Sequence, residues 1–340
     1  MSRRLPAEWE FQDAVQLTLP HQDTDWCDVL PEAQQCFSAI ATEISKRQKL
    51  ILACQDIEEA KTWLGDINYD NVIFKQVPSN DTWARDHAAF TVYDNEQLVL
   101  FDFMFNGWGL KFASDQDNQI TRRLHEQNTF GNTPIVTFGF VLEGGSIESD
   151  GQGTLLTTSN CLLSYNRNPT YSRIEVENKL KEFFGANNVL WLDHGHLEGD
   201  DTDAHIDTLA RLCDTNTIAY VQCTDKEDPH YHALKQMEDE LKAFRTKGGK
   251  PYKLIALPMA PERRDPDDGH RLPATYANFL IMNGAVLVPT YKAEEADAIA
   301  LNALAEAFPD REIIGIDCSV LIKQHGSLHC VTMQYPEGTL

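Results

Sequence analysis

The chain contains a series of short apolar runs, each long enough for one strand, and segments with helical periodicity separate them. The apolar runs predict strands at residues 50–54, 72–77, 98–103, 135–138, 154–157, 189–192, 218–222, 254–257, 278–282, 285–289 and 313–317. Helical patterns predict helices at residues 32–48, 57–65, 173–184, 231–245 and 293–308. This alternation indicates an α/β protein, but periodicity alone does not separate a doubly wound sheet from a propeller-like ring.

The segment 173–184 illustrates the helical signal. Gly185 follows it as a helix stop. Its apolar residues predict one buried stripe, made of Ile174, Val176, Leu180 and Phe184.

The charge balance argues against some partners. The chain has 29 Lys and Arg against 52 Asp and Glu, a net charge of −23, so it lacks the basic surface that nucleic acids and anionic membranes require. A negative field would instead draw in a cationic substrate. No apolar run reaches the about 20 residues of a membrane span. Because no apolar stretch follows Arg3 and Arg4 as it would in a signal peptide, we expect a cytoplasmic protein.

The sequence contains no recognisable cofactor motif. No Gly-rich fingerprint follows a predicted strand, so a dinucleotide or P-loop site is not supported. The eight cysteines are irregularly spaced without a Cys-x-x-Cys pair, which argues against a zinc ribbon or a disulfide framework. The segment 258–273 is rich in prolines and charges, and we predict a long surface loop there that could serve as a lid.

Cys330 is the cysteine whose neighbours set it apart. Gly326 before it permits an unusual backbone, and Cys330 then opens an apolar stretch. A free thiol is most often a buried core residue. The alternative is a nucleophile, which needs a positive neighbour because an ordinary thiol has a pKa of about 8.5. His205 or the cation of a substrate would supply that charge.

Two carboxylates stand in settings that suggest strand ends or tight turns. Asp86 follows Trp83 and Arg85, which indicates either a surface ion pair beside a half-buried ring or a carboxylate presented to a cationic ligand. Glu143 ends an apolar strand before two glycines, which let the backbone turn sharply or approach a ligand closely. The alternative at Glu143 is a turn with a solvated side chain.

The densest cluster of His and Asp lies near the middle of the chain. In one interpretation His205 moves protons and Asp207 lies on the same face of an extended segment. In a second, the cluster is a metal site, although it has no fixed ligand spacing such as His-Glu-x-x-His; its ligands would be His194, His196 and Asp200. In a third, the segment is a polar loop with satisfied histidines.

Together these segments supply carboxylates, a histidine and a thiol. A guanidinium is planar, positive and a hydrogen-bond donor on every edge, so paired carboxylates bind it well. Resonance makes its central carbon a poor electrophile. Thiolate attack, followed by protonation of the departing nitrogen as ammonia, opens a covalent route. The set therefore favours cysteine-dependent hydrolysis of a guanidine.

Seven short motifs occur in order along nearly the whole chain: Leu5-Pro-Ala-Glu-Trp-Glu10, Trp83-Ala-Arg-Asp86, Asn106-Gly-Trp-Gly109, Glu143-Gly-Gly-Ser146 with Asp150-Gly151, Asn166-Arg-Asn-Pro169, Asp201-Thr-Asp-Ala-His-Ile-Asp207 and Gly326-Ser-Leu-His-Cys330. Through them the chain resembles the agmatine deiminase and bacterial-type peptidylarginine deiminase family of guanidino-group modifying enzymes. The resemblance implies one domain over residues 1–340 with a pentein fold, an α/β propeller of five ββαβ-like units around a pseudo-fivefold axis. It implies a site in the central channel, no metal or organic cofactor and a small cationic guanidine as the partner. It is compatible with a homo-oligomer.

The resemblance also implies roles for individual residues. Cys330 matches the nucleophile that forms an amidino-cysteine (thiouronium) intermediate. His205 matches the histidine that protonates the leaving ammonia and then activates water. Asp86 and Asp207 match the carboxylates that grip the guanidinium, and Glu143 is assigned to the shell that binds the guanidinium and orients the histidine.

The far end of the substrate is left open. Trp83 is expected to line the pocket. Two departures bear on substrate choice: Ala204 stands where the family commonly has Gly, and residues 325–328 read His-Gly-Ser-Leu where many agmatine deiminases have Gly-Gly-Asn-Ile. The carboxylate of an arginine substrate would need a cationic partner, for which the candidates are Arg85, Arg263, Arg264 and Arg271.

The acidic chain favours doubly cationic agmatine, whose hydrolysis to N-carbamoylputrescine and ammonia is a step toward putrescine. The alternatives are free or peptidyl arginine giving citrulline, a metal-dependent amidohydrolase, and a non-catalytic pentein that only binds its ligand.

Overall fold

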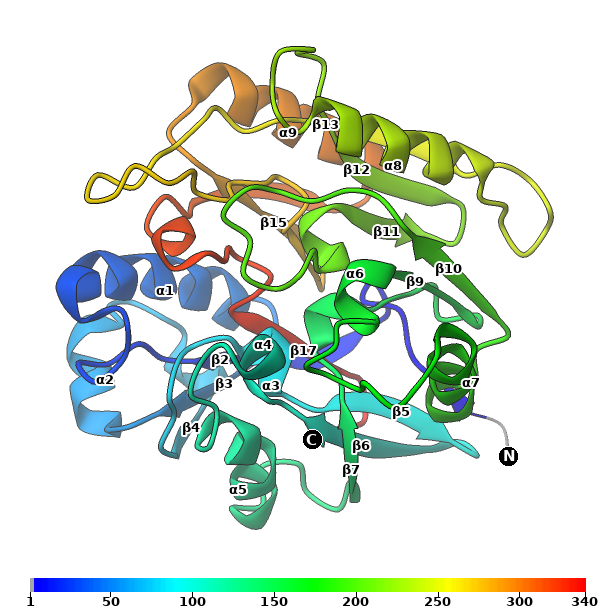
Figure 1. The fold of residues 1–340 in the computed structure, drawn as a ribbon. Helices are drawn as coiled ribbons and strands as arrows, with labels where there is room; N and C mark the ends of the chain where they lie inside the picture. Colours follow the sequence, from blue (N-terminus) through cyan, green and yellow to red (C-terminus); the bar gives the residue numbers. More distant parts are fainter. Residues whose placement is uncertain (1–2) are drawn as a thin grey trace.

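The computed structural model describes residues 3–340, whose strands form five separate sheets (Figure 1). In every sheet an antiparallel pair of strands shares one strand with a parallel pair. Helical crossovers join the two parallel strands, as parallel pairing requires. The chain therefore has a mixed α/β fold in which one connectivity recurs from sheet to sheet.

The strands have the following order in the sheets. The first sheet is β17 (Thr332–Pro336), β2 (Gln12–Thr18), β3 (Lys49–Cys54) and β4 (Val72–Gln76); the second is β1 (Arg3–Arg4), β5 (Phe90–Asp94), β6 (Gln97–Met104) and β7 (Ile135–Val141). The third is β10 (Asn188–Leu192), β9 (Thr154–Thr158) and β8 (Glu148–Ser149); the fourth is β11 (Ala210–Asp214), β12 (Thr217–Gln222) and β13 (Lys253–Pro258). The fifth is β14 (Leu280–Met282), β15 (Ala285–Thr290) and β16 (Glu312–Asp317).

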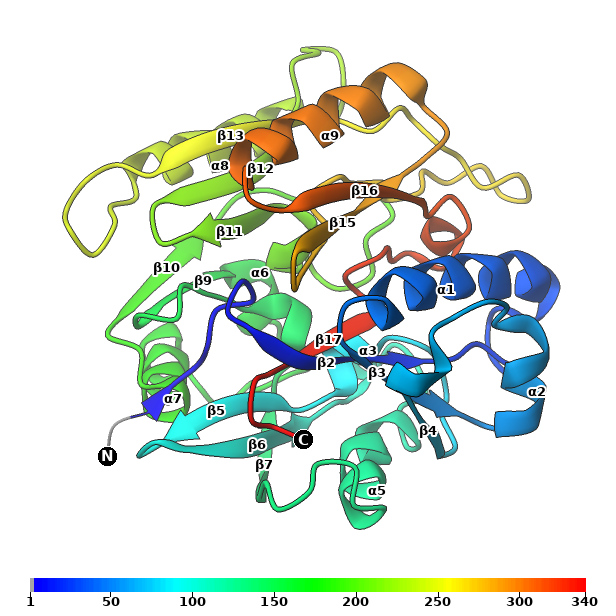
Figure 2. The same ribbon diagram turned by 180° about the vertical axis from the view of Figure 1, so that it is seen from behind.

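The longer helices lie at the periphery, and strands such as β2, β15 and β17 lie toward the centre in both views (Figures 1 and 2). The longer helices are α1 (Leu30–Ser45), α2 (Ile57–Trp63), α5 (Ile120–Glu126), α7 (Arg173–Phe184), α8 (Tyr231–Ala243) and α9 (Glu294–Ala307). Three one-turn helices are α3 (Ala84–His87), α4 (Gly107–Leu110) and α6 (Ser159–Leu162). None of the helices in residues 3–340 combines the length and the apolar character needed to cross a membrane.

All eleven strands and five helices predicted from the sequence are present, with ends that differ by at most three residues. The predicted bounds of α7 are confirmed, and Gly185 ends this helix with a φ of 67°. The prediction for Ile174 is wrong, since its side chain is 69% exposed. Ile174 and Val176 are two residues apart and so point to opposite sides of a helix. Phe183 is buried instead.

Pairing of β17 with β2 brings the C-terminal part of the chain to the centre of the molecule (Figure 2). Cys330 lies just before β17 and is 3% exposed. All eight cysteines are free thiols, and Cys27 alone among them is exposed. The segment 258–273 forms the predicted irregular loop, in which Arg264 pairs with Arg271 in an isolated bridge.

Candidate active site

Each connection from one sheet to the next contributes one part of a polar centre. Asp86 lies between β4 and β5, and Glu143 lies between β7 and β8. His205 lies between β10 and β11, Asn278 between β13 and β14, and Cys330 between β16 and β17. The repeated connectivity therefore brings together residues from five distant parts of the chain.

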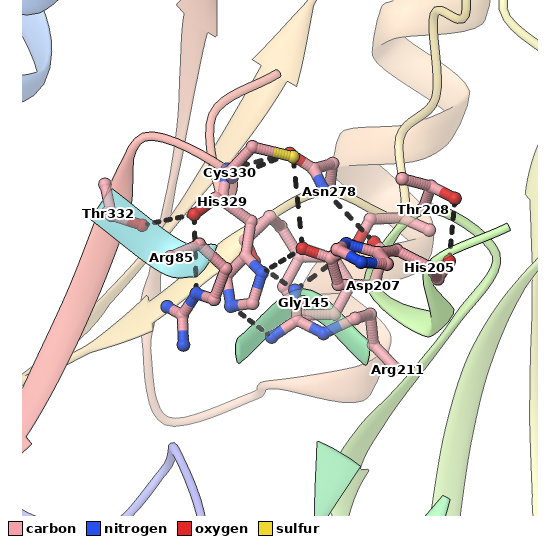
Figure 3. Close-up of polar contacts among 12 residues, drawn as sticks. Arg85, Gly145, His205, Asp207, Thr208, Arg211, Asn278, His329, Cys330 and Thr332 are labelled. Atoms are coloured by element: carbon pink, nitrogen blue, oxygen red, sulfur yellow. Dashed lines mark hydrogen bonds and ion pairs between the residues drawn. The ribbon is translucent and has the colours of Figure 1, made fainter. Parts of the chain in front are cut away.

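Gly145 is the point around which three of the predicted site residues meet; Figure 3 shows two of them, His205 and Asp207, beside it. A Cβ atom at this position would lie 2.6 Å from His205 Nδ1, 2.9 Å from Asp86 Oδ1 and 3.1 Å from Asp207 Oδ1. Real Cβ atoms essentially never have neighbours closer than 3.0 Å. The missing side chain therefore creates the space in which a histidine and two carboxylates approach one another.

Asp86 is fixed by two hydrogen bonds. Its Oδ1 accepts from the Gly145 N–H at 2.9 Å, and its Oδ2 accepts from Trp108 Nε1 at 3.0 Å. Trp108 reaches Asp86 from a left-handed turn, in which residues 107–110 have φ values of 67°, 53°, 83° and 67°. A left-handed conformation is strained for Trp108 and Leu110, which are not glycines. Burial raises the pKa of Asp86, and the nearby charge of His205 opposes that rise.

His205 is fully buried, and neither of its ring nitrogens has a hydrogen-bond partner among the described residues. Its Nδ1 lies 3.6 Å from Asp86 Oδ1, too far for a hydrogen bond. Burial disfavours the imidazolium, but Asp86, Cys161 and Glu143 outweigh it and raise the pKa of His205 to about 10. His205 therefore carries a proton at neutral pH and can donate it.

Asp207 is held from one side only (Figure 3). His329 Nδ1 donates to its Oδ2 at 2.7 Å, whereas its Oδ1 is buried without a partner. Burial opposes the ionisation of Asp207, yet the hydrogen bond and charge of His329, with the charges of His205 and Arg211, lower its pKa. An unpaired buried carboxylate oxygen is unfavourable unless a ligand donates to it.

The Cys330 thiol lies beside this carboxylate, with its Sγ 4.0 Å from Asp207 Oδ2. The Cys330 N–H donates to Asn278 Oδ1 at 3.2 Å. Burial raises the pKa of Cys330 well above its ordinary value, and the carboxylates of Asp207 and Asp86 raise it further. The thiol is therefore protonated at neutral pH. A cation bound between Asp86 and Asp207 would offset the effect of both carboxylates.

Glu143 is already engaged by a buried arginine. Both of its carboxylate oxygens accept from Arg167 Nε, at 2.8 and 3.0 Å, and Arg167 also donates to Asp203 at 2.5 Å. The ligand-type atoms of Glu143, Cys161 and His205 all lie within 4.8 Å of one another. A metal ion held by these three would lie next to the Arg167 guanidinium, so the arrangement favours an orienting role for Glu143 over metal binding.

A pocket leads from the surface to Cys330. It is lined by the aromatic rings of Trp83, Trp108 and Phe112, the carboxylates of Asp25, Asp81, Asp86 and Asp201, and Thr202, Gln324, His325, Gly326 and Cys330. No arginine or lysine is among the described residues that line it. The pocket thus combines flat aromatic walls with carboxylates at several depths, a surface suited to a cation.

Gly326 packs against the Trp83 ring, since a Cβ atom there would lie 2.1 Å from it. The prediction that Gly326 supplies the unusual backbone is wrong. The left-handed residue is His325, with a φ of 66°. The glycine is needed for the close approach of the ring.

The four arginines considered as partners for a substrate carboxylate do not line this pocket. Arg85 is buried and faces Met333 and the His329 carbonyl. The other three make contacts elsewhere: Arg263 donates to the Tyr291 carbonyl, Arg264 pairs with Glu262, and Arg271 pairs with Asp228.

The family described as Porphyromonas-type peptidyl-arginine deiminase matches residues 4–336. The chain belongs to this family.

Three relatives illustrate how closely members of the family resemble the chain. A Porphyromonas gingivalis structure named "Putative Arginine Deiminase" is 52% identical, covers 100% of both chains and has a TM-score of 0.95. A C. jejuni agmatine deiminase with substrate bound is 39% identical over 99% of this chain and 97% of that chain, with a TM-score of 0.92. A Lactococcus lactis protein named "Putative agmatine deiminase" is 33% identical over 358 residues, covering 98% of this chain and 96% of the relative.

A more distant structure shares the fold alone. DDAH from Pseudomonas aeruginosa is 12% identical, and the match covers 96% of this chain and 100% of that chain with a TM-score of 0.50. The mixed α/β fold of this family member therefore extends to a protein of low sequence identity.

The metal-site residues do not cluster. His194 pairs with Glu240 of α8 at 2.6 Å, and Asp200 accepts from the backbone of Thr202 and Ala204. Within residues 3–340, the groups of ligand-type side chains with atoms within 4.8 Å of one another do not include His194, His196 or Asp200.

The extended segment predicted for residues 205–207 is also wrong. Residues Ile206–Thr208 form a 3-10 turn. This turn still directs His205 and Asp207 toward the space at Gly145.

Sequence reasoning missed the residues that support the site. Asn278, His329 and Arg211 are buried polar residues in contact with its members. His329 adjoins Cys330 in the last of the seven motifs, so its position was a usable signal. Arg211 and Asn278 had no local signal in the sequence, because each forms these hydrogen bonds with residues more than 50 positions away.

Proposed function

We propose that this protein is an agmatine deiminase, which hydrolyses agmatine to N-carbamoylputrescine and ammonia through a covalent intermediate on Cys330. The single observation that carries the proposal is the group of unpaired buried atoms around Gly145: both ring nitrogens of His205 and Oδ1 of Asp207. Native proteins rarely leave buried polar atoms unpaired. The unpaired Oδ1 of Asp207 favours a ligand with N–H donors, and the protonated ring of His205 keeps its N–H groups free to donate a proton. The family and the named relatives support the same chemistry.

In the proposed complex, the guanidinium lies between Asp86 and Asp207 with its plane along the aromatic wall made by Trp83 and Trp108. Two carboxylates match its donor edges and balance its charge. With that positive charge next to Cys330, the thiol loses its proton to solvent more readily, because the charge of the substrate offsets the carboxylates that raised the thiol pKa.

The Cys330 thiolate then attacks the central guanidinium carbon, forming a C–S bond and a neutral tetrahedral adduct. His205 donates its proton to one NH₂ nitrogen, the C–N bond breaks, and ammonia leaves. The remaining thiouronium is positive and stays between the carboxylates. His205 is now neutral and can accept a proton.

In the second half-reaction His205 takes a proton from water, and the hydroxide adds to the thiouronium carbon. The C–S bond breaks as the adduct hydroxyl gives its proton to solvent, where the released ammonia takes up a proton as ammonium, and this leaves a urea group on the product and returns the thiolate. Glu143, locked by Arg167, orients His205 and keeps its protonated form favourable in both steps.

The composition of the pocket supports agmatine over arginine. Beyond Asp86, the pocket is lined by the carboxylates of Asp25, Asp81 and Asp201, and no Arg or Lys lines it in the described part of the chain. The second amine of agmatine would be attracted there, whereas the carboxylate of arginine would be repelled. For one charged group of the substrate about 4 Å from one carboxylate, at an effective dielectric of about 20, the attraction or repulsion is on the order of 4 kcal/mol before the cost of desolvation is subtracted.

Arginine, free or in peptides, is the second candidate. It is favoured by the family description and by the name of the 52% identical Porphyromonas gingivalis structure. Parallel ammonia-release assays on agmatine, arginine and a peptide with a C-terminal arginine decide between the two. We expect kcat/KM to be highest for agmatine. A preference for arginine or for the peptide would overturn the agmatine assignment, and activity toward none of them would overturn the deiminase itself.

The proposal includes a single pentein domain over residues 1–340, with five ββαβ-like units around a pseudo-fivefold axis. The recurring connectivity of the five sheets supports it. We also propose a cytoplasmic location, since eight free cysteines are typical of a reducing compartment.

A further inference from the structure

The N-terminal motif Leu5-Pro-Ala-Glu-Trp-Glu10 has no part in the chemistry described so far, yet it places one carboxylate deep in the molecule. Glu8 is 8% exposed. Its Oε2 accepts from Arg211 Nη2 at 2.8 Å, and its Oε1 accepts from the Ile281 N–H at 2.6 Å. Burial opposes ionisation, but the charges of Arg211, His329 and Arg85 hold the pKa of Glu8 well below its usual range. Glu8 is therefore a fixed buried anion.

His329 links this anion to the candidate active site (Figure 3 shows its contacts with Asp207 and Arg211). Its Nε2 lies 2.8 Å from Glu8 Oε2, and its Nδ1 lies 2.7 Å from Asp207 Oδ2. Each of the two carboxylates, Glu8 and Asp207, therefore pairs with one ring nitrogen of His329, and Arg211 Nη2 also lies 3.0 Å from Nε2. The imidazole is thus tied at both ends, and its ring cannot rotate without losing a buried charge-assisted hydrogen bond.

The two carboxylate oxygens of Asp207 have different surroundings. Oδ2 is taken by His329, while Oδ1 is unpaired and lies on the Gly145 side beside His205. Because a carboxylate is planar, fixing one oxygen fixes the direction of the other. His329 therefore sets the angle at which Asp207 meets a bound cation.

The backbone of the same residue is tied to the nucleophile. His329 N–H and Cys330 N–H both donate to Asn278 Oδ1, at 2.9 and 3.2 Å. Arg85 N–H donates to the Cys330 carbonyl at 3.1 Å. The backbone at Cys330 is therefore held independently of the His329 side chain, so substitutions of the ring can be interpreted through Asp207.

We propose that Glu8 and His329 are positioning residues. They hold Asp207 in the orientation needed to bind the guanidinium group of the substrate next to Cys330. This inference rests on the proposed function and extends it to the N-terminal segment. Neither residue touches the reacting atoms. Supporting groups of this kind typically change activity about 10–100-fold when removed.

The test compares His329→Asn with His329→Gln. The Asn amide nitrogen can occupy the place of Nδ1 and still donate to Asp207, whereas the longer Gln side chain reaches toward the place of Nε2 and Glu8. Glu8→Gln keeps the shape but removes the charge. Glu10→Gln is the matched control, since Glu10 belongs to the same motif but contacts Arg4 and the Ala7 N–H instead.

The readout is the rate at which Cys330 is alkylated by chloroacetamidine, divided by the rate with neutral chloroacetamide. This ratio measures how well the carboxylates hold an amidinium beside the thiol, and it does not depend on turnover of any natural substrate. We expect His329→Gln and Glu8→Gln to lower the ratio about 10-fold or more, while His329→Asn and Glu10→Gln stay within about threefold of the unmodified protein.

Steady-state rates on agmatine give a second readout. We expect KM to rise more than kcat falls in His329→Gln, with rescue in His329→Asn. Thermal unfolding of each variant identifies a variant that fails to fold, in which case Glu8→Gln, the isosteric change, decides. An unchanged amidine-to-amide ratio in folded His329→Gln and Glu8→Gln would overturn the positioning role. Normal selectivity for the amidine in a protein that hydrolyses no guanidine would instead overturn the proposed function alone.

Discussion

Replacing Gly145 with alanine tests whether an empty side-chain position is what allows the site to assemble. The methyl carbon would lie 2.6 Å from His205 Nδ1 and 2.9 Å from Asp86 Oδ1, whereas ordinary contacts begin at 3.4 Å. At least one of these groups, or the backbone of residues 144–146, must therefore move by several tenths of an ångström.

The size of the effect follows from that displacement. Overpacking of a buried site costs about 1–3 kcal/mol of stability, and a misplacement approaching 1 Å in a catalytic group lowers the rate about 100-fold. We expect Gly145→Ala to remain folded, with its free energy of unfolding lowered by up to about 3 kcal/mol. Its kcat for ammonia release from agmatine should fall about 100-fold.

The assay is steady-state ammonia release combined with urea unfolding. Gly139→Ala is the matched control, because Gly139 lies in β7, a few residues before Gly145, and a Cβ atom there has no heavy atom within 4 Å. Activity of Gly145→Ala within about threefold of the unmodified protein would refute the reasoning, as would an equal loss in Gly139→Ala.

Three further predictions follow from the same contacts. Ala204 has a φ of 65°, a conformation that favours glycine. In urea titrations, Ala204→Gly should therefore leave the free energy of unfolding unchanged or raise it by up to about 1 kcal/mol. A loss above about 1 kcal/mol would contradict the argument that the backbone is strained at Ala204. Trp108→Phe removes the donor to Asp86 Oδ2 and should raise KM for agmatine by about threefold to tenfold, whereas an unchanged KM would show that this bond does not orient Asp86. The pKa of His205 is about 10 in the folded protein and about 6.5 in an unfolded chain. Because the native state binds the extra proton between these values, the free energy of unfolding should fall as the pH rises from about 7 to about 10. An equal slope of the free energy of unfolding against pH in the unmodified protein and in His205→Asn would contradict the raised pKa of His205.

Local patterns predicted the elements that carry their own signals. The segment 173–184 has a capping box at Ser172 and a left-handed Gly185, so both ends of α7 were readable. The missed strands are β1, β2, β5, β8, β11 and β17. Among them, β2 and β17 pair with each other across the whole length of the chain. The segments 12–18 and 332–336 lack a sustained apolar run. Long-range pairing, which periodicity does not report, stabilises them.

In the candidate site, too, local motifs could be recognised from the sequence, whereas long-range contacts could not. The roles of Cys330, His205, Asp207, Asp86 and Glu143 came from motif resemblance and stay predictions. Family membership is confirmed. His329 had a usable signal in its place beside Cys330, but Arg211 and Asn278 could not be predicted, because their contacts join distant parts of the chain and depend on the finished fold.

Attack of Cys330 on the guanidinium carbon can be observed in the mass of the intact protein after acid quenching during turnover of agmatine. We predict a covalent adduct with the mass of agmatine minus ammonia, located on the peptide that contains Cys330, and no adduct and no ammonia release in folded Cys330→Ala. Ammonia release by Cys330→Ala, or full turnover by the unmodified protein with no adduct on Cys330, would contradict the account.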